Sequence, residues 1–317
     1  MELLERSRQL LRDEHAAAER EDAFRNLVIG YEKLLKTAVK ISRISDIQGR
    51  TLKEREQKLR EAGESLKMME AQRKKLVSDI SHELGTPMTS IQGYVKAMLD
   101  GVVPADGEYL GMIYGKVQYV NQLVADLFQL SRLESNKIPF TFRLLTPEEL
   151  LRPYTTKFKI DADKAGVELS FTSCSQAAEA PIGSRKLVKA DPYRIEQVMT
   201  NFVHNAIKFT PSGGAIQIEA ELGDAPGEQS GTSLIVRVTD TGIGLHEESL
   251  PYVFERFYRV KAADGEGVSG TGLGLAISRE IILQHNGTIG VISKYGEGST
   301  FYFTLPMVDM EQKGTMV

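Results

Sequence analysis

Hydrophobic residues recur at seven-residue intervals in the charge-rich N-terminal part of the chain. The two series are Leu52, Leu59 and Leu66, and Ala62, Met69 and Leu76. They occupy the a and d positions of a heptad repeat. The pattern predicts that residues 1–71 are helical and contain a short coiled coil. The alternative is a single amphipathic helix that packs on its own domain.

Residues 72–137 show two apolar stripes at helical spacing, separated by a breaker at residues 101–107. The first stripe contains Ile80, Leu84, Ile91, Val95 and Met98, and the second contains Ile113, Val117, Val120, Val124, Leu127 and Leu130. A short connector predicts an antiparallel helical hairpin. Two helices cannot bury both stripes, so a second copy is expected to complete a four-helix bundle. This all-α domain is therefore predicted to form a homodimer.

Residues 138–308 alternate between strand-like and helix-like patterns. Residues 167–171, 215–219 and 234–238 predict strands, 191–209 and 272–285 predict helices, and 287–291 with 300–305 predict a terminal hairpin. This mixture predicts an α+β two-layer sandwich with helices on one face of a sheet. Residues 309–317 are expected to form a tail. The chain is thus predicted to be multidomain.

Composition narrows the class of protein. The 317 residues carry 39 Lys and Arg against 43 Asp and Glu, a net charge of −4 that gives no reason to expect nucleic acid as a partner. The single cysteine, Cys174, cannot form an intrachain disulfide, which suits a reducing compartment. No apolar run approaches the roughly 20 residues of a transmembrane helix, and no signal peptide is evident. A cytoplasmic protein is expected, which could still reach a membrane through a partner.

His82 is the first candidate for chemistry. It follows Ile80 by two residues, about 200° around a helix, and so is expected to face solvent. Glu83 could steer or take a ring proton, and Thr86 shares the outer face. Pro87 predicts a bend close by. Taken alone, a solvated surface histidine is the simpler interpretation.

Polar residues of the 191–209 helix form a second candidate site. Asn201, Asn205 and Lys208 share one face of this helix. Amide oxygens can ligate Mg²⁺, and a lysine can contact phosphate oxygens. A hydrated polar face would explain any one of these residues alone.

Glycine-rich segments follow at two places. Asp240 ends a strand and precedes Gly242 and Gly244, an arrangement that could bind an amino-bearing ring. Residues 270–274 contain Gly270, Gly272 and Gly274 before a helix, where backbone N–H groups could meet phosphates. Neither a complete dinucleotide fingerprint nor a Walker sequence is present. Residues 261–269 are small and polar, and we expect them to form a lid over the nucleotide.

The order of these motifs resembles that of sensor histidine kinases of bacterial two-component systems. The resemblance covers about residues 72–306. It includes the histidine segment, the asparagine helix, the Asp240 loop, residues 253–259, the Gly270–Gly274 loop and the glycine motif at 296–301. It implies a dimerisation and phosphotransfer domain, followed by an ATP-binding domain of the fold that gyrase and Hsp90 share.

The resemblance also implies a role for each site residue. His82 would accept the γ-phosphoryl group, with Glu83 as base or orienter and Thr86 positioning water for dephosphorylation of the partner. Asn205 would ligate Mg²⁺. The ATP site would comprise Asn201, Lys208, Phe209, Asp240, Gly242, Gly244, Arg259, Gly270, Gly272, Gly274 and Thr300. Asp240 would bind the adenine amino group, and Arg259 would reach the γ-phosphate. The implied partners are a response regulator receiver domain, a second copy and an upstream sensor protein.

Two departures and three alternatives accompany this interpretation. Gly85 stands where the family usually has a basic residue, and Ser269 replaces a frequent glycine. Residues 1–71 show no recognisable sensor domain. An ATPase or serine kinase of the same C-terminal fold, a coiled-coil scaffold with a degenerate ATP site, and a member acting mainly as a phosphatase are the competing hypotheses.

Overall fold

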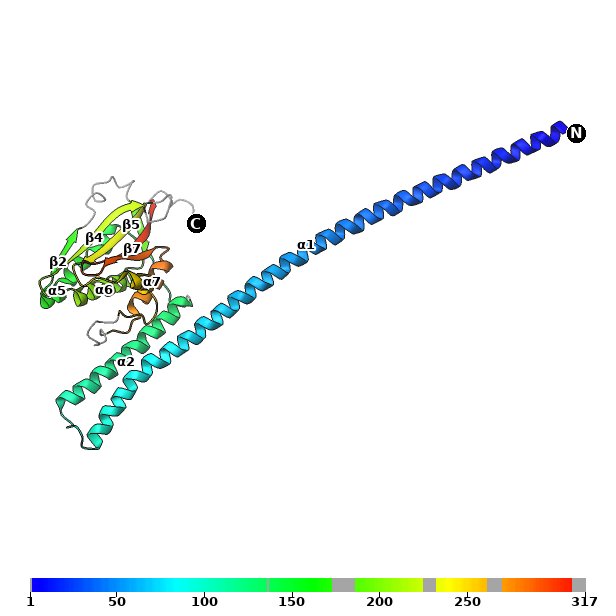
Figure 1. The fold of residues 1–317 in the computed structure, drawn as a ribbon. Helices are drawn as coiled ribbons and strands as arrows, with labels where there is room; N and C mark the ends of the chain where they lie inside the picture. The colour runs from blue at the N-terminus through cyan, green and yellow to red at the C-terminus, as the bar shows by residue number, and fades with distance from the viewer. Residues whose placement is uncertain (1, 136, 173–185, 225–231, 261–269, 310–317) are drawn as a thin grey trace. The chain divides into compact units, whose positions relative to one another are not determined.

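The computed structural model describes residues 2–135, 137–172, 186–224, 232–260 and 270–309 (Figure 1). Cys174, the expected lid at 261–269 and all but the first residue of the expected tail lie outside these ranges. The chain divides into two compact units, residues 1–81 and 82–317. Each unit is considered by itself.

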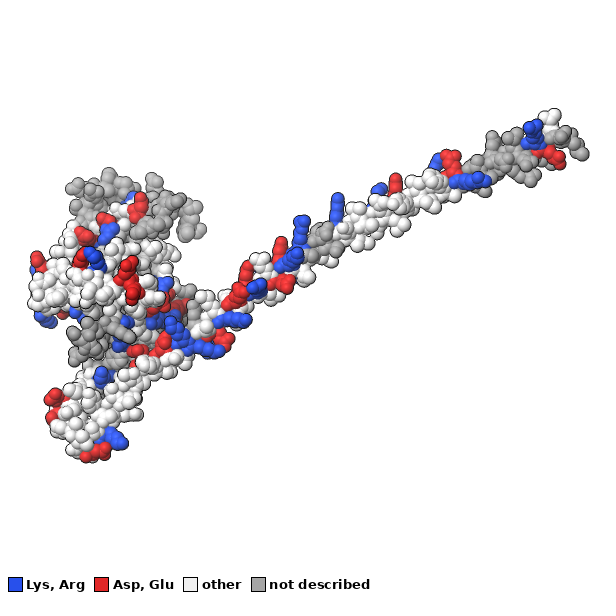
Figure 2. Space-filling model, in the orientation of Figure 1, with Lys and Arg blue, Asp and Glu red and all other residues white. Residues whose placement is uncertain are grey.

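The first unit consists of the N-terminal part of one long helix, α1 (Glu2–Leu99). Leu52, Leu59 and Leu66 of the heptad series are exposed along it. Acidic and basic side chains are interspersed on its visible face (Figure 2), and pairs such as Arg60–Glu64, at 3.2 Å, stabilise adjacent turns. Among the described helices, none combines the length and apolarity that a membrane span requires.

The second unit begins with the end of α1 and α2 (Gly107–Glu134). The predicted break lies where α1 stops, and Asp106 caps α2 by accepting hydrogen bonds from the backbone N–H groups of Glu108 and Tyr109. The helical hairpin is therefore confirmed. α1 continues through Pro87, and the expected bend does not interrupt it. The hydroxyls of Thr86 and Ser90 each donate to a carbonyl four residues earlier beside this proline.

The α+β part of the second unit follows the hairpin. Its helices are α3 (Pro147–Leu151), α4 (Tyr154–Lys157), α5 (Lys159–Ala165), α6 (Pro192–Phe209), the 3-10 helix η3 (Glu247–Tyr252) and α7 (Gly274–Gln284). Its strands are β1 (Arg143–Leu145), β2 (Glu168–Thr172), β3 (Lys186–Ala190), β4 (Ala215–Asp224), β5 (Thr232–Asp240), β6 (Ile289–Lys294) and β7 (Gly298–Asp309). The predicted strands, helices and terminal hairpin are all present.

The strands form one sheet in the order β1-β3-β7-β5-β4-β2, with β6 paired to β7. The β2–β4 pair is parallel, and the other pairs are antiparallel. β5 lies between β4 and β7, and its last residue, Asp240, pairs with Ile216 and Ser299. The central strand thus carries Asp240 to the sheet edge where the site forms.

Helices α5, α6 and α7 cover one face of the sheet (Figure 1). The apolar face of α6 supplies Ile195, Val198 and Phe202, which are fully or almost fully buried. Phe202 packs against Phe301 and Phe303 of β7, with ring centroids 5.5 and 6.2 Å away. Burial of this face fixes the rotation of α6 and directs its polar face away from the sheet.

Candidate active site

His82 lies on the exposed face of α1, as predicted. Its side chain is 81% exposed, and its Nδ1 is 3.8 Å from Oε1 of Glu83. With Nδ1 toward the carboxylate, Nε2 is the ring nitrogen left to react. Thr86 lies one turn later, where its hydroxyl donates to the His82 carbonyl at 3.2 Å. The three residues predicted to take part in phosphotransfer and dephosphorylation are therefore neighbours.

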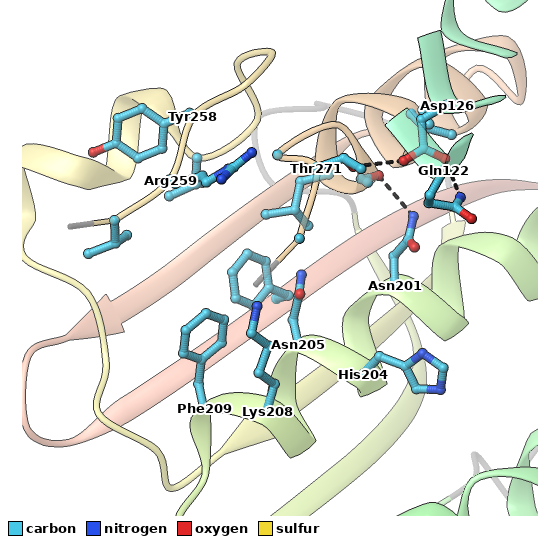
Figure 3. A pocket seen from close by; sticks show the side chains of 18 of the residues that line it. Gln122, Asp126, Asn201, His204, Asn205, Lys208, Phe209, Tyr258, Arg259 and Thr271 are labelled. Carbon is cyan, nitrogen blue, oxygen red and sulfur yellow. Dashed lines mark hydrogen bonds between the residues drawn. The ribbon is translucent and has the colours of Figure 1, made fainter. Parts of the chain in front are cut away.

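A separate cavity of about 1040 Å³ lies among α6, the loops around it and α2 (Figure 3). Ten of the predicted nucleotide-site residues line it: Asn201, Asn205, Lys208, Phe209, Asp240, Gly244, Arg259, Gly270, Gly272 and Gly274. His82, Glu83, Thr86, Gly242 and Thr300 are not among the lining residues. The structure thus forms two groups, the His82 cluster on α1 and a cavity that could hold a nucleotide.

The polar face of α6 forms one wall of the cavity. Asn201, Asn205 and Lys208 point into it from successive turns (Figure 3). Nδ2 of Asn201 donates to the Gly274 carbonyl at 2.9 Å and to the Ser278 hydroxyl at 3.0 Å. Both amide hydrogens are thereby used, and Oδ1 remains the accepting atom. This donor set suits Mg²⁺, which prefers oxygen ligands and shares them with nucleotide phosphates.

Lys208 places a cation at the same wall. Its Nζ lies 5.1 Å from the centroid of the Phe209 ring. Burial, and then the nearby positive charge of Arg259, lowers the pKa of Lys208. Two cations held close to one another favour an anion between them, and a polyphosphate would satisfy both.

Asp240 forms the buried acidic end of the cavity. Its Oδ1 accepts hydrogen bonds from the backbone N–H groups of Gly242, at 2.8 Å, and Ser299, at 3.3 Å. Burial raises the pKa of Asp240, although these two hydrogen bonds oppose the rise. The carboxylate is rigidly held, as recognition of an amino group requires.

Glycines allow the backbone to approach closely around this wall. Gly244 has a φ of +65°, and a Cβ there would lie 2.1 Å from the Lys294 carbonyl oxygen. Gly272 has a φ of +69°, and a Cβ there would lie 2.9 Å from the Phe257 backbone. Phe257 itself has a φ of +61° and donates its N–H to the Gly272 carbonyl at 2.9 Å. This hydrogen bond therefore joins the segment that precedes residues 261–269 to the segment that follows them.

Thr300 lies on β7 beside the cavity rather than in its lining. Its hydroxyl is 3.0 Å from that of Thr239 on β5. Its neighbours Ser299 and Phe301 line the cavity instead, because successive residues of a strand face opposite sides. Gly242 contributes through its backbone, which donates to Asp240.

Several residues at the site were not singled out from the sequence. Tyr119 of α2 contacts both Glu83 and Arg259. Asp126 of α2 accepts a hydrogen bond from Thr271 at 2.7 Å, and Gln129 of α2 pairs with Gln197 of α6. The sequence offers no signal for these pairs, because they join residues far apart in the chain. Potential metal clusters of three or more His, Cys, Asp or Glu are absent from the described ranges.

Comparison with known proteins matches both parts of this arrangement. Residues 72–136 match the family model of the His Kinase A phospho-acceptor domain, and residues 190–309 match that of the histidine kinase-, DNA gyrase B- and HSP90-like ATPases. The sensor protein SrrB of Staphylococcus aureus (strain NCTC 8325 / PS 47) is 32% identical over 241 residues, or 75% of this chain and 39% of SrrB. The chain thus spans about two fifths of the length of this relative.

Solved structures are similar over the same region. The histidine kinase AdeS of Acinetobacter baumannii has a TM-score of 0.54 and 25% identity, and the match covers 72% of this chain and 98% of AdeS. Histidine kinase ThkA, solved in complex with the response regulator protein TrrA, has a TM-score of 0.54 and 24% identity, covering 73% of this chain and 61% of that one. Because residues 72–136 and 190–309 match these two domain families and a sensor protein is 32% identical over 241 residues, the chain belongs to the sensor histidine kinases.

Proposed function

We propose that the protein is an ATP-dependent histidine autokinase that phosphorylates itself on His82 and passes the phosphoryl group to an aspartate of a response regulator receiver domain. The observation that carries this proposal is the pairing of His82 with Glu83. An exposed imidazole has its Nδ1 beside a carboxylate and its Nε2 directed away. The cavity that holds Asp240, Asn205 and Lys208 provides the matching nucleotide site.

This geometry supports a direct transfer step. The Nε2 lone pair of His82 forms a bond to the γ-phosphorus of ATP, and the bond from that phosphorus to the bridging oxygen breaks. ADP leaves with the electron pair. Glu83 accepts the proton from Nδ1, and the ring therefore does not retain a positive charge.

The cavity residues bind and orient the nucleotide. Asp240 accepts the adenine amino hydrogen bond, and Lys208 and Arg259 contact phosphate oxygens. Asn205, with Asn201 beside it, holds Mg²⁺, which neutralises phosphate charge when bound. Backbone N–H groups at Gly270, Gly272 and Gly274 complete the phosphate contacts before α7. Gly244 and Phe209 line the adenine end. Gly242 and Thr300 support it from outside the lining, through their hydrogen bonds to Asp240 and Thr239.

The remaining proposals concern assembly and partners. The exposed apolar residues of α1 and α2 support a homodimer formed through residues 72–137, with residues 1–71 as the signalling coiled coil and residues 138–308 as the ATP-binding domain. We place the protein in the cytoplasm, where response regulators and ATP are present. An upstream sensor protein would act on residues 1–71. Thr86, one turn after His82, would position water for dephosphorylation of the response regulator.

Labelling with γ-³²P-ATP and Mg²⁺ tests the proposal. Wild-type protein and His246→Gln, which alters an exposed histidine outside the cavity, should acquire a label that is lost in acid and survives alkali. His82→Gln should acquire none. A label that survives acid would indicate a hydroxyl acceptor and favour a serine kinase. Absence of label together with absence of ATP-analogue binding would favour the scaffold.

A further inference from the structure

Tyr119 of α2 lies between the phosphoacceptor and the nucleotide cavity. Its hydroxyl donates to Oε2 of Glu83 at 3.3 Å and accepts a hydrogen bond from Nη2 of Arg259. The Arg259 guanidinium also lies over its ring, 5.7 Å from the centroid. The tyrosine therefore contacts both charged groups that the proposed function places around the transferred phosphoryl group.

The two oxygens of the Glu83 carboxylate have different partners. Oε1 faces Nδ1 of His82 at 3.8 Å, whereas Oε2 accepts from Tyr119 and from Nη2 of Arg259 at 2.8 Å. The Glu83 side chain is 24% exposed, compared with 81% for His82. Contacts to Oε2 thus determine the rotation of the carboxylate, and this rotation determines where Oε1 meets the imidazole.

Arg259 has a second task in the proposed reaction. It lines the nucleotide cavity, and the proposed function requires it at a phosphate. Its Nε is buried without a hydrogen-bond partner among the described residues, so its present position leaves one donor unsatisfied. When Arg259 turns to the phosphate, Tyr119 remains as the described partner of Oε2.

The phenol suits this role chemically. Burial is the main cause that raises the pKa of Tyr119 above its usual value of 10.0. The hydroxyl therefore keeps its proton near neutral pH and can donate to a carboxylate. It adds no charge that would compete with the phosphate for Arg259.

We propose that Tyr119 is a positioning residue for autophosphorylation: its hydroxyl holds the Glu83 carboxylate against Nδ1 of His82 after Arg259 has moved to the nucleotide. This inference rests on the proposed function. Tyr119 forms no bond with substrate. It acts only through Glu83, and this dependence can be measured.

A double-mutant cycle in the full chain tests the dependence. Tyr119→Phe should lower the autophosphorylation rate about tenfold, the effect of losing one hydrogen bond of this kind. The KM for ATP and the affinity for an ATP analogue should stay unchanged. In a Glu83→Gln background, Tyr119→Phe should cause no further loss. Tyr114→Phe, which alters an exposed tyrosine of the same helix, is the control and should match wild type.

Three results would overturn the proposal. An unchanged or increased rate in Tyr119→Phe would show that the hydroxyl does not help Glu83. Equal losses from Tyr119→Phe in the wild-type and Glu83→Gln backgrounds would indicate general damage to the fold. A rise in the KM for ATP with an unchanged maximal rate would assign Tyr119 to nucleotide binding.

A second readout separates this proposal from the proposed function. The same cycle is measured on the free energy of unfolding, which needs no activity. Coupling between Tyr119 and Glu83 is expected there, and its absence would overturn the contact itself. If Tyr119 and Glu83 are coupled in stability but the wild-type protein never acquires a label on His82, the kinase assignment is wrong, and the positioning role is wrong with it.

Discussion

Glu134, the last residue of α2, forms an ion pair with Arg256, which lies three residues before Arg259 in the chain. Two further pairs join α2 to the ATP-binding part: Asp126 with Thr271, and Gln129 with Gln197. All three pairs involve α2. The residues of the latter two pairs line the cavity, and His82 is not among its lining residues. We therefore expect these contacts to shift when a nucleotide in the cavity is brought to His82.

Weakening the Glu134–Arg256 pair should consequently accelerate autophosphorylation. We expect Glu134→Arg to raise the labelling rate several-fold, because a contact that holds the resting arrangement becomes repulsive. Adding Arg256→Glu should return the rate toward that of wild type. Initial rates of γ-³²P incorporation measure this. Glu168→Arg, at an exposed position on β2, controls for the change in net charge, and a slower Glu134→Arg variant would contradict the prediction.

Asp240 should govern nucleotide affinity. Asp240→Asn is expected to weaken binding of a fluorescent ATP analogue at least tenfold, because it replaces the carboxylate acceptor by an amide with only one accepting oxygen. Asp224→Asn, at the exposed end of β4, should bind as wild type does. Burial raises the pKa of Asp240. As the pH is lowered, the affinity for the ATP analogue should therefore begin to fall at a higher pH than it would with an ordinary carboxyl group. Equal affinity of Asp240→Asn and wild type would exclude this adenine contact.

His285 should make the free energy of unfolding depend on pH. Its Nε2 accepts the N–H of Asp191 at 3.0 Å, and its Nδ1 lies 2.7 Å from the Ile281 carbonyl, which fits a neutral ring. Burial lowers the pKa of His285 below 6.5. Near that pH the histidine binds a proton more readily in the unfolded chain than in the folded protein. The free energy of unfolding therefore falls as the pH drops through 6.5 toward the folded-state pKa.

Urea unfolding between pH 8 and pH 5.5 measures this effect. The wild-type loss of stability across the range should shrink in His285→Gln and persist in His246→Gln. Stability that is lower overall in His285→Gln, with an unchanged dependence on pH, would assign the acid sensitivity to other groups.

Gly85 and Gly244 should respond in opposite ways to an added methyl group. A Cβ at Gly85 would meet no atom within 4 Å, and the position lies inside α1. Gly85→Ala should therefore stabilise the protein by about 1 kcal/mol. Gly244→Ala should destabilise it by more than that, because the Cβ would collide with the Lys294 carbonyl. Thermal unfolding of both variants measures the contrast, and a shift of the same sign in each would contradict it.

Periodicity predicted α6, α7, β4 and β5 because each of them buries a face whose spacing is visible in the sequence. The shorter elements β1, β3, α3, α4, α5 and η3 were not predicted. The same reasoning brought Asn201, Asn205 and Lys208 together, since they share a helix. Tyr119 could not be found in this way. Its partners Glu83 and Arg259 lie 36 and 140 residues away along the chain, and only the packing of the hairpin brings them together. Resemblance supplied the expected role of Arg259, which depends on a ligand rather than on local structure.

Asp191 has a consequence for how far the ATP-binding part can travel. It caps α6 and also accepts the N–H of Thr141, while Phe140 and Phe142 pack edge-on against His285 beside it. The chain is therefore anchored from about Phe140 onward, and α2 ends at Glu134. Between these points, the N–H of Lys137 donates to the Arg132 carbonyl at 2.9 Å, and Ile138 packs against the core. A large movement of the ATP-binding part relative to α2 would therefore have to break the contacts of Lys137 or Ile138 at this junction.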